Sequence, residues 1–218
     1  MAKLSSIEIP KYSLGEELMS AISHGIGGLL SIAALVLCVV FSAIHHNAYA
    51  VVSSAIYGST SIILYTMSTL YHSLKPNRAK KVFRIIDHCS IFLLIAGTYT
   101  PFALVALPKA IGWTIFGVNW GCAIIGIILN AIDMKRFKKI SMVLYLVMGW
   151  MIVFTFKDLK AAVDMGCIYL SLTAGALYTV GAIFYGIGKK HKYMHSIFHL
   201  FVLSASILFF FAIFLYVI

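Results

Sequence analysis

Two histidines near the C-terminus, His195 and His199, are four residues apart in a strongly apolar segment. On an α-helix this spacing places both side chains on one face, about 6 Å apart along the axis. Two imidazoles in this arrangement can bind one zinc ion, with Zn–N distances of about 2.0–2.1 Å. Alone, the pair is weak evidence for a metal site, because two helix-end histidines that face lipid headgroups would show the same pattern.

Three further polar residues fall in two other apolar segments. Ser68 and His72 lie one helical turn apart in "STLYHS", and Asp87 opens "DHCSIFLL". A third histidine completes the three-ligand set of a catalytic zinc site, in which water takes the fourth position. Asp87 would then accept a proton from a water activated by the metal, and Ser68 would stabilise an oxyanion or orient that water. The sequence therefore predicts a zinc centre with these ligands and catalytic residues: metal His72, His195 and His199; catalytic Asp87 and Ser68.

Each of these residues also has a simpler interpretation. An aspartate at the centre of a membrane helix costs about 2.5–3.5 kcal/mol, so Asp87 needs a partner, which Arg84 could supply from three residues earlier. Ser68 could merely fill a close helix contact. His24 could approach the cluster, but three histidines already suffice as ligands. His88 points about 100° away from Asp87 on a helix and is interpreted as a packing or interfacial residue.

The segments that must position these residues form an all-α, polytopic membrane protein. The 218 residues are 61% hydrophobic and 11% charged, whereas soluble domains are about 45–50% apolar and 25% charged. A membrane-spanning helix needs about 20 apolar residues. Pro101 is expected to kink or end the third helix, and the fifth helix is the shortest. We predict a single seven-helix membrane domain over residues 1–218, with helices near 22–44, 49–72, 83–106, 110–132, 140–156, 163–187 and 194–217.

The basic residues predict an orientation. The N-terminal tail and the connections after the second, fourth and sixth helices hold 2, 5, 4 and 3 of the 17 lysines and arginines. The other side keeps only Lys109, Lys157 and Lys160, so the positive-inside rule places the N-terminus in the cytoplasm and the C-terminus outside. The predicted site residues then share one membrane depth at the cytoplasmic face. Because the net charge of +10 comes from these loops, the expected partners are membrane lipids and not nucleic acid.

Two further features bear on processing and redox chemistry. The first twenty residues mix charges with apolar positions and lack a continuous apolar core followed by a small-residue cleavage site, so we expect no cleaved signal peptide. The four cysteines are scattered singly, with no CxxC pair, and are expected to be small packing residues.

Four stretches, "EELMSAISHGIG", "STLYHS", "DHCSIFLLIAGTYTPF" and "HSIFHLFVL", together resemble the haemolysin III family. This family is the bacterial branch of the superfamily that contains the progestin and adiponectin receptors. The resemblance covers essentially the whole chain. It implies seven helices with a cytoplasmic N-terminus in the bacterial plasma membrane. It also implies a zinc site near the cytoplasmic face, mapped here onto Ser68, His72, Asp87, His195 and His199.

The resemblance extends to the start of the chain with one departure. Glu17 matches a glutamate of the family's N-terminal motif, but Ser20 stands where the family usually has asparagine. The role of Glu17, Ser20 and His24 therefore stays open at the level of sequence.

Three functions are compatible with these patterns. The first is a metal-dependent hydrolase that acts on an amide or ester bond of a membrane lipid, which is the chemistry that the wider superfamily implies. The second is a non-enzymatic sensor or regulator of membrane-lipid homeostasis with a structural zinc. The third is a haemolysin-type cytolysin, which the sequence disfavours because it has no polar-lined amphipathic segment and no evident water-soluble form.

Overall fold

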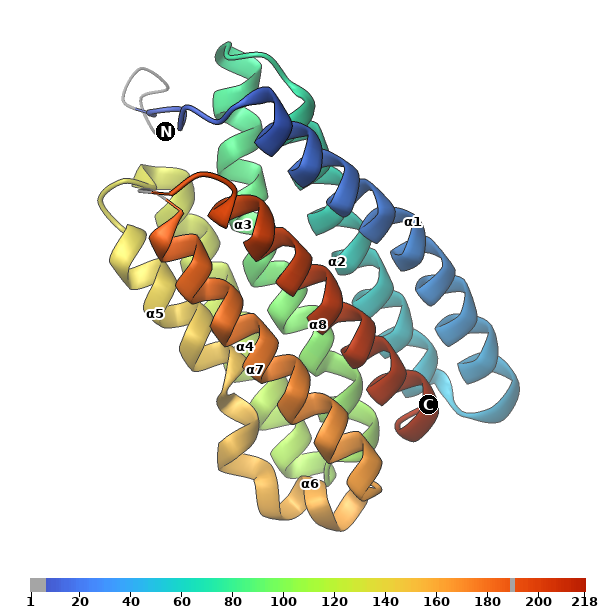
Figure 1. Ribbon diagram of the computed structural model, residues 1–218. Helices are drawn as coiled ribbons and strands as arrows, with labels where there is room; N and C mark the ends of the chain where they lie inside the picture. The colour runs from blue at the N-terminus through green and yellow to red at the C-terminus, as the bar shows by residue number, and fades with distance from the viewer. Residues whose placement is uncertain (1–6, 189–190) are drawn as a thin grey trace.

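The computed structural model describes residues 7–188 and 191–218, and all regular structure in them is helical (Figure 1). Within these residues, seven helical spans are long and apolar enough to cross a membrane. The all-α, seven-helix prediction is therefore confirmed. In chain order the elements are α1 Leu14–His45, α2 Ala48–Ser73, α3 Arg78–Pro101, η2 Phe102–Ala106, α4 Lys109–Asp133, α5 Lys138–Gly149, η3 Met151–Thr155, α6 Phe156–Ala162, α7 Met165–Ile187 and α8 Met194–Tyr216.

Side-chain caps set where several helices begin. The predicted start of the first helix, residue 22, is wrong by eight residues, because Ser13 and Glu16 form a capping box that begins α1 at Leu14. Such a box satisfies backbone donors that the first helical turn leaves free. Asn47 and Asn77 cap α2 and α3 in the same way, by accepting hydrogen bonds from backbone N–H groups of the first turn. The extra turns of α1 bring acidic residues into the bundle that hydropathy had placed outside it.

The third and fifth spans are interrupted helices. As predicted, α3 ends at Pro101 and continues as the π-helical turn η2. The fifth span was predicted at 140–156 as the shortest, which is wrong: it covers the 25 residues Lys138–Ala162 in three pieces, α5, η3 and α6. Tyr99 compensates for the break, since its hydroxyl donates to the Gly149 carbonyl (2.6 Å) and accepts from Ile152 N–H (3.0 Å). Backbone N–H and C=O groups that lose their helical hydrogen bonds inside a membrane need such replacement partners.

Neighbours in sequence pack against one another from α1 to α5, and α8 contacts both α7 and α1 (Figure 1). The span that contains α3 is the most buried of the seven. Small residues permit the close contacts: a Cβ atom at Gly97 on α3 would clash with the Thr60 hydroxyl on α2. Large apolar side chains cover the outer faces, as for Leu29 (70% exposed) and Phe154 (84% exposed). This surface suits lipid, and the charged residues lie in the interior or toward the ends of the bundle.

The two ends of the bundle differ in content. The N-terminal segment, the α2–α3 and α4–α5 connections and the start of α8 lie at one end, which we call the basic end, and the C-terminus lies at the other (Figure 1). The basic end carries most of the lysines and arginines of the chain. Its placement in the cytoplasm stays a prediction from the charge distribution.

Candidate metal centre

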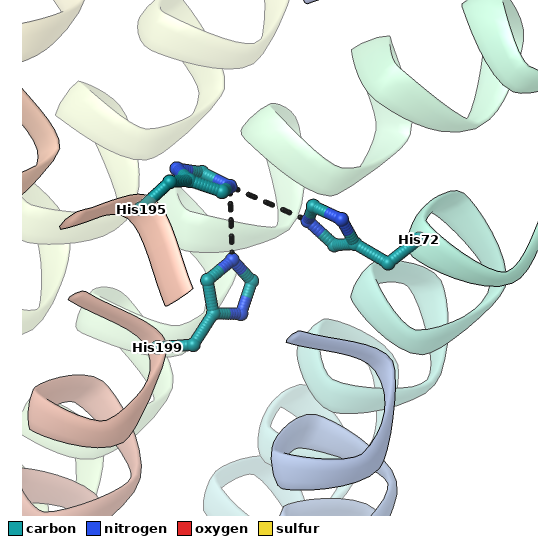
Figure 2. Close-up of side chains that lie close together, drawn as sticks. All are labelled: His72, His195 and His199. Carbon is teal, nitrogen blue, oxygen red and sulfur yellow. Dashed lines mark hydrogen bonds between the residues drawn. The ribbon is translucent and has the colours of Figure 1, made fainter. Parts of the chain in front are cut away.

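Three histidines meet inside the basic end (Figure 2). His72 belongs to the last turn of α2, and His195 and His199 occupy the first two turns of α8. All three are buried. The Nε2 atom of His195 lies 3.4 Å from that of His72 and 3.1 Å from that of His199. Helices separated by more than a hundred residues of sequence thus deliver three imidazole nitrogens to one point, within 4.8 Å of one another.

The spacing fits a small divalent ion. Ligands at about 2.0–2.1 Å from a tetrahedral zinc lie about 3.3 Å from one another, close to the two Nε2 separations given above. A metal ligand must present a lone pair, so the proton of each imidazole has to lie on its other nitrogen. In His72 that nitrogen, Nδ1, is 2.7 Å from Glu17 Oε2. A hydrogen bond from Nδ1–H to this carboxylate leaves the Nε2 lone pair directed at the other two histidines.

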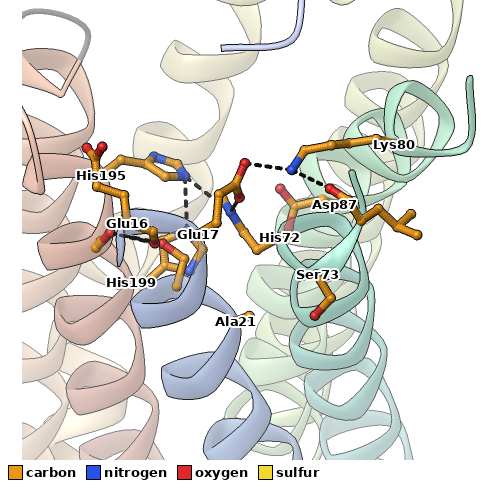
Figure 3. A network of polar contacts seen from close by, with 12 residues as sticks. Glu16, Glu17, Ala21, His72, Ser73, Lys80, Asp87, His195 and His199 are labelled. Carbon is orange, nitrogen blue, oxygen red and sulfur yellow. Dashed lines mark hydrogen bonds and ion pairs between the residues drawn. The ribbon is translucent and has the colours of Figure 1, made fainter. Parts of the chain in front are cut away.

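Glu17 also binds a buried lysine (Figure 3). The Nζ atom of Lys80, in the first turn of α3, donates to Glu17 Oε1 (2.6 Å) and to the Leu74 carbonyl (2.8 Å). Lys80 is only 1% exposed, and a buried charge of this kind requires a partner. Glu17 therefore links α1, α2 and α3 and holds the His72 ring in one orientation, the usual role of a carboxylate behind a metal-bound histidine.

Asp87 and Ser68 both reach this region. Asp87 is buried, interacts electrostatically with His72 and His24, and belongs to the same polar network in Figure 3. Ser68 is buried one turn before His72, and its Oγ has no hydrogen-bond partner among the described residues. The fold thus brings both predicted catalytic residues near the three histidines. Their catalytic roles stay predictions.

The neighbours of Asp87 in the structure differ from those considered in the sequence. Its partner is His88, whose Nδ1 lies 3.5 Å from Asp87 Oδ2, and no ion pair with Arg84 occurs within the described part of the chain. Although adjacent side chains diverge on a helix, the His88 ring turns back along the backbone, where Nδ1 is also 2.9 Å from the Arg84 carbonyl. His88 therefore contacts the site instead of only packing.

The fold also answers what the sequence left open at the N-terminus. Ser20 donates to Ser196 (3.1 Å), and Ser196 donates to the Glu16 carbonyl (3.0 Å), which joins α1 to α8 beside His195. A hydroxyl, which is shorter than an asparagine side chain, is enough for this contact. The His24 ring is buried with both nitrogens unpartnered among the described residues, and its centroid is 3.9 Å from that of His199. It adjoins the three-histidine group without being part of it.

Tyr12 closes the site from the outside. Its ring stacks on His195, with centroids 4.8 Å apart and planes inclined by 9°. Burial raises the pKa of the Tyr12 phenol above its ordinary value, so the side chain stays neutral. The sequence did not predict Tyr12 or Lys80 as site residues, because the stretches that contain them have the composition of polar loops. Only the fold shows that Lys80 is buried and bonded to Glu17.

The polar centre inside seven apolar helices defines a class: a multi-pass membrane protein with a candidate metal site in the bundle. Comparison with known families agrees. Residues 12–210 match the sequence model of the family described as "Haemolysin-III related", and the chain belongs to this family. With its bacterial relatives, the seven apolar helices indicate a multi-pass protein of the bacterial cell membrane.

Individual relatives cover most of the chain. It is 44% identical to Hemolysin-3 of Bacillus cereus over 202 aligned residues. The alignment covers 93% of this chain and 92% of the relative. It is 42% identical over 205 residues to the Hemolysin-3 homolog of Bacillus subtilis (strain 168), with 94% and 96% covered. A more distant match is the human Monocyte to macrophage differentiation factor, 26% identical over 177 residues, or 76% of this chain and 70% of that protein.

Proposed function

We propose that this protein is a zinc-dependent hydrolase that cleaves an amide or ester bond of a membrane lipid at the cytoplasmic face. One observation carries the proposal: three buried imidazole Nε2 atoms converge at metal-ligand spacing, and the Nδ1 atom of His72 is bonded to Glu17. Without an ion, the three Nε2 atoms can be satisfied only by N–H···N hydrogen bonds among themselves. A cation among them would accept all three lone pairs at once, and three histidines are a ligand set of catalytic zinc.

The chain supplies the groups that hydrolysis needs around this point. Zinc, when bound, acts as a Lewis acid and lowers the pKa of a bound water to about 7. The Asp87 carboxylate accepts the proton of the attacking water. The free hydroxyl of Ser68 donates a hydrogen bond to the carbonyl oxygen of the substrate as negative charge develops there. Because the site lies inside an apolar bundle, a lipid is the substrate class that can reach it without crossing water.

The substitution Asp87→Asn tests the catalytic half of the proposal. It removes the base but none of the three histidines, so zinc content should stay near one per chain while lipid turnover falls by about 10²–10⁴-fold. Metal analysis and a panel of amide- and ester-linked lipids measure the two quantities on the same preparation. Asp133→Asn is the matched control, since Asp133 caps the end of α4 by accepting from the N–H groups of Lys135 and Arg136. Equal turnover in wild type and Asp87→Asn would exclude Asp87 as the base.

A second candidate function follows from which helices supply the three histidine ligands. They come only from α2 and α8, so a bound ion would join two helices that are far apart in the sequence. In that case the protein is a regulator of membrane-lipid homeostasis with a structural zinc. Removal of the metal would then lower Tm sharply. Zinc-loaded wild-type protein that turns over no lipid of the panel would favour this function over the hydrolase.

A further inference from the structure

A polar cavity of about 250 Å³ adjoins the candidate metal centre at the basic end. It lies between the N-terminal segment, the start of α5, the end of α7 and the first turns of α3. Tyr12 lines it on one side and stacks on His195 with the same ring. Its charged and aromatic lining includes Lys11, Tyr12, Glu16, Arg84, Lys138 and Lys192.

The lining has a marked excess of positive charge. Two lysines and an arginine of the α3, α5 and α8 regions, with Lys11, face a single carboxylate, that of Glu16. That carboxylate is already engaged: Oε2 accepts from Ser13 N–H and Oγ (2.8 Å each), and Oε1 accepts from Tyr193 N–H (2.8 Å). Glu16 therefore serves as a helix cap and a tether of the α8 start, and its single negative charge does not balance the four positive charges that line the cavity.

Arg84 is the most informative of the four. The side chain is half-buried, and its Nε atom is buried with no hydrogen-bond partner among the described residues. A buried donor without a partner calls for a ligand or an ion. The planar guanidinium presents parallel N–H groups that match the oxygens of phosphate and carboxylate in a two-point contact.

We propose that this cavity binds a phosphate-type anion, either the headgroup of an anionic phospholipid or a soluble phosphate. The volume is below the about 300–1,000 Å³ of sites for drug-sized ligands, so it suits a headgroup and not a whole lipid. Basic pockets between transmembrane helices at the cytoplasmic side bind anionic headgroups in this way. The inference goes beyond the proposed hydrolase, because none of its cations contributes to the three-histidine group.

The test uses full-length protein in maltoside micelles, which contain no phosphate. Binding of inorganic phosphate is followed by calorimetry, and binding of short-chain phosphatidylglycerol by native mass spectrometry. We expect Arg84→Gln to weaken binding about tenfold or more, because it removes charge-assisted hydrogen bonds. The matched control is Arg136→Gln, which removes the same charge at the same end; Arg136 lies outside the cavity, against the ring of Phe137. Lys192→Gln, at an exposed position, provides a second cavity variant if Arg84→Gln does not fold.

The outcomes separate the two sources of the anion. Phosphate binding that depends on Arg84 identifies a soluble anion, and binding of phosphatidylglycerol alone, again dependent on Arg84, identifies a lipid headgroup. The inference is overturned if neither probe binds, or if Arg136→Gln weakens binding as much as the cavity variants do. Repeating the measurement in the His195→Ala/His199→Ala background should leave binding intact, so that failure of the metal site and failure of the anion site are distinguishable.

Discussion

The two ends of the bundle each contain a pair of histidines, but only one pair lies in a site. At the basic end, His195 and His199 are buried and approach His72. At the opposite end, His45 and His46 are exposed where α1 ends, and their rings lie near that of Phe41. Histidine content alone therefore does not define the centre. What distinguishes the basic end is that polar side chains from α1, α2, α3 and α8 are buried together.

Burial of polar and charged side chains costs free energy, and at the basic end specific partners offset this cost. Glu17 is bonded to both His72 and Lys80, and Asp87 lies against His88. In contrast, the opposite end is packed mainly by apolar side chains, with few polar contacts such as that between Ser42 and Ser54 (2.9 Å). Unpaired polar groups are expensive in an apolar interior. The concentration of such groups at one end indicates a functional requirement there.

The largest effect is expected from removing the buried pair. In the double variant His195→Ala/His199→Ala, two of three nitrogen donors are lost, so zinc should fall from about one per chain to background. Elemental analysis of purified protein measures this. The double variant His45→Ala/His46→Ala at the opposite end is the control and should keep its metal. Equal zinc in both double variants would contradict the assignment of the centre.

A smaller effect is expected for the carboxylate behind His72. Glu17→Gln weakens the hydrogen bond that orients the ring, and loss of such a partner lowers metal affinity by about 10–100-fold. Competition with a chelator of known affinity gives the value. Glu8→Gln is the matched control, because Glu8 is an exposed carboxylate at the same end that pairs only with Lys135 among the described residues (2.6 Å). An unchanged metal affinity in Glu17→Gln would show that Glu17 does not orient the His72 ring for metal binding.

The next prediction compares a buried and an exposed lysine of the basic end. Lys80→Met removes a charged donor from Glu17 and should destabilise the protein by about 1.5–3 kcal/mol, the range for hydrogen bonds to charged groups. Thermal unfolding in detergent measures the change in Tm. Lys135→Met breaks an exposed ion pair with Glu8 and should leave Tm nearly unchanged, since solvent screens such pairs. A similar Tm for both variants would show that the buried Lys80–Glu17 pair stabilises the protein no more than the exposed Lys135–Glu8 pair.

The smallest expected effect compares one serine contact at each end. Ser20→Ala loses the hydrogen bond to Ser196, and Ser42→Ala loses the one to Ser54. Each should cost about 0.5–1.5 kcal/mol of stability. Only Ser20→Ala should also weaken metal binding, by less than tenfold, because Ser196 adjoins His195. If Ser42→Ala changed metal affinity equally, the coupling would be global and not local to the basic end.

Much of the fold was predictable because it depends on local chemistry. Apolar runs of sufficient length predicted the seven spans, and Pro101 predicted the end of α3. The start of α1 and the extent of the fifth span were mispredicted. Hydropathy does not register the Ser13 capping box or the Tyr99 hydroxyl that bridges the broken helix. Both depend on individual hydrogen bonds.

The candidate metal centre was likewise predictable only in part. The residue types that could bind a metal were visible in the sequence, and the spacing of His195 and His199 predicted that they share one helix face. Three other features became visible only in the folded bundle: Glu17 bonds to His72, Lys80 is buried, and the ring of Tyr12 covers that of His195. This difference arises because helix periodicity specifies the direction of a side chain only relative to its own helix. Its partner and its burial depend on which helices meet, and α1, α2, α3 and α8 meet only in the assembled bundle.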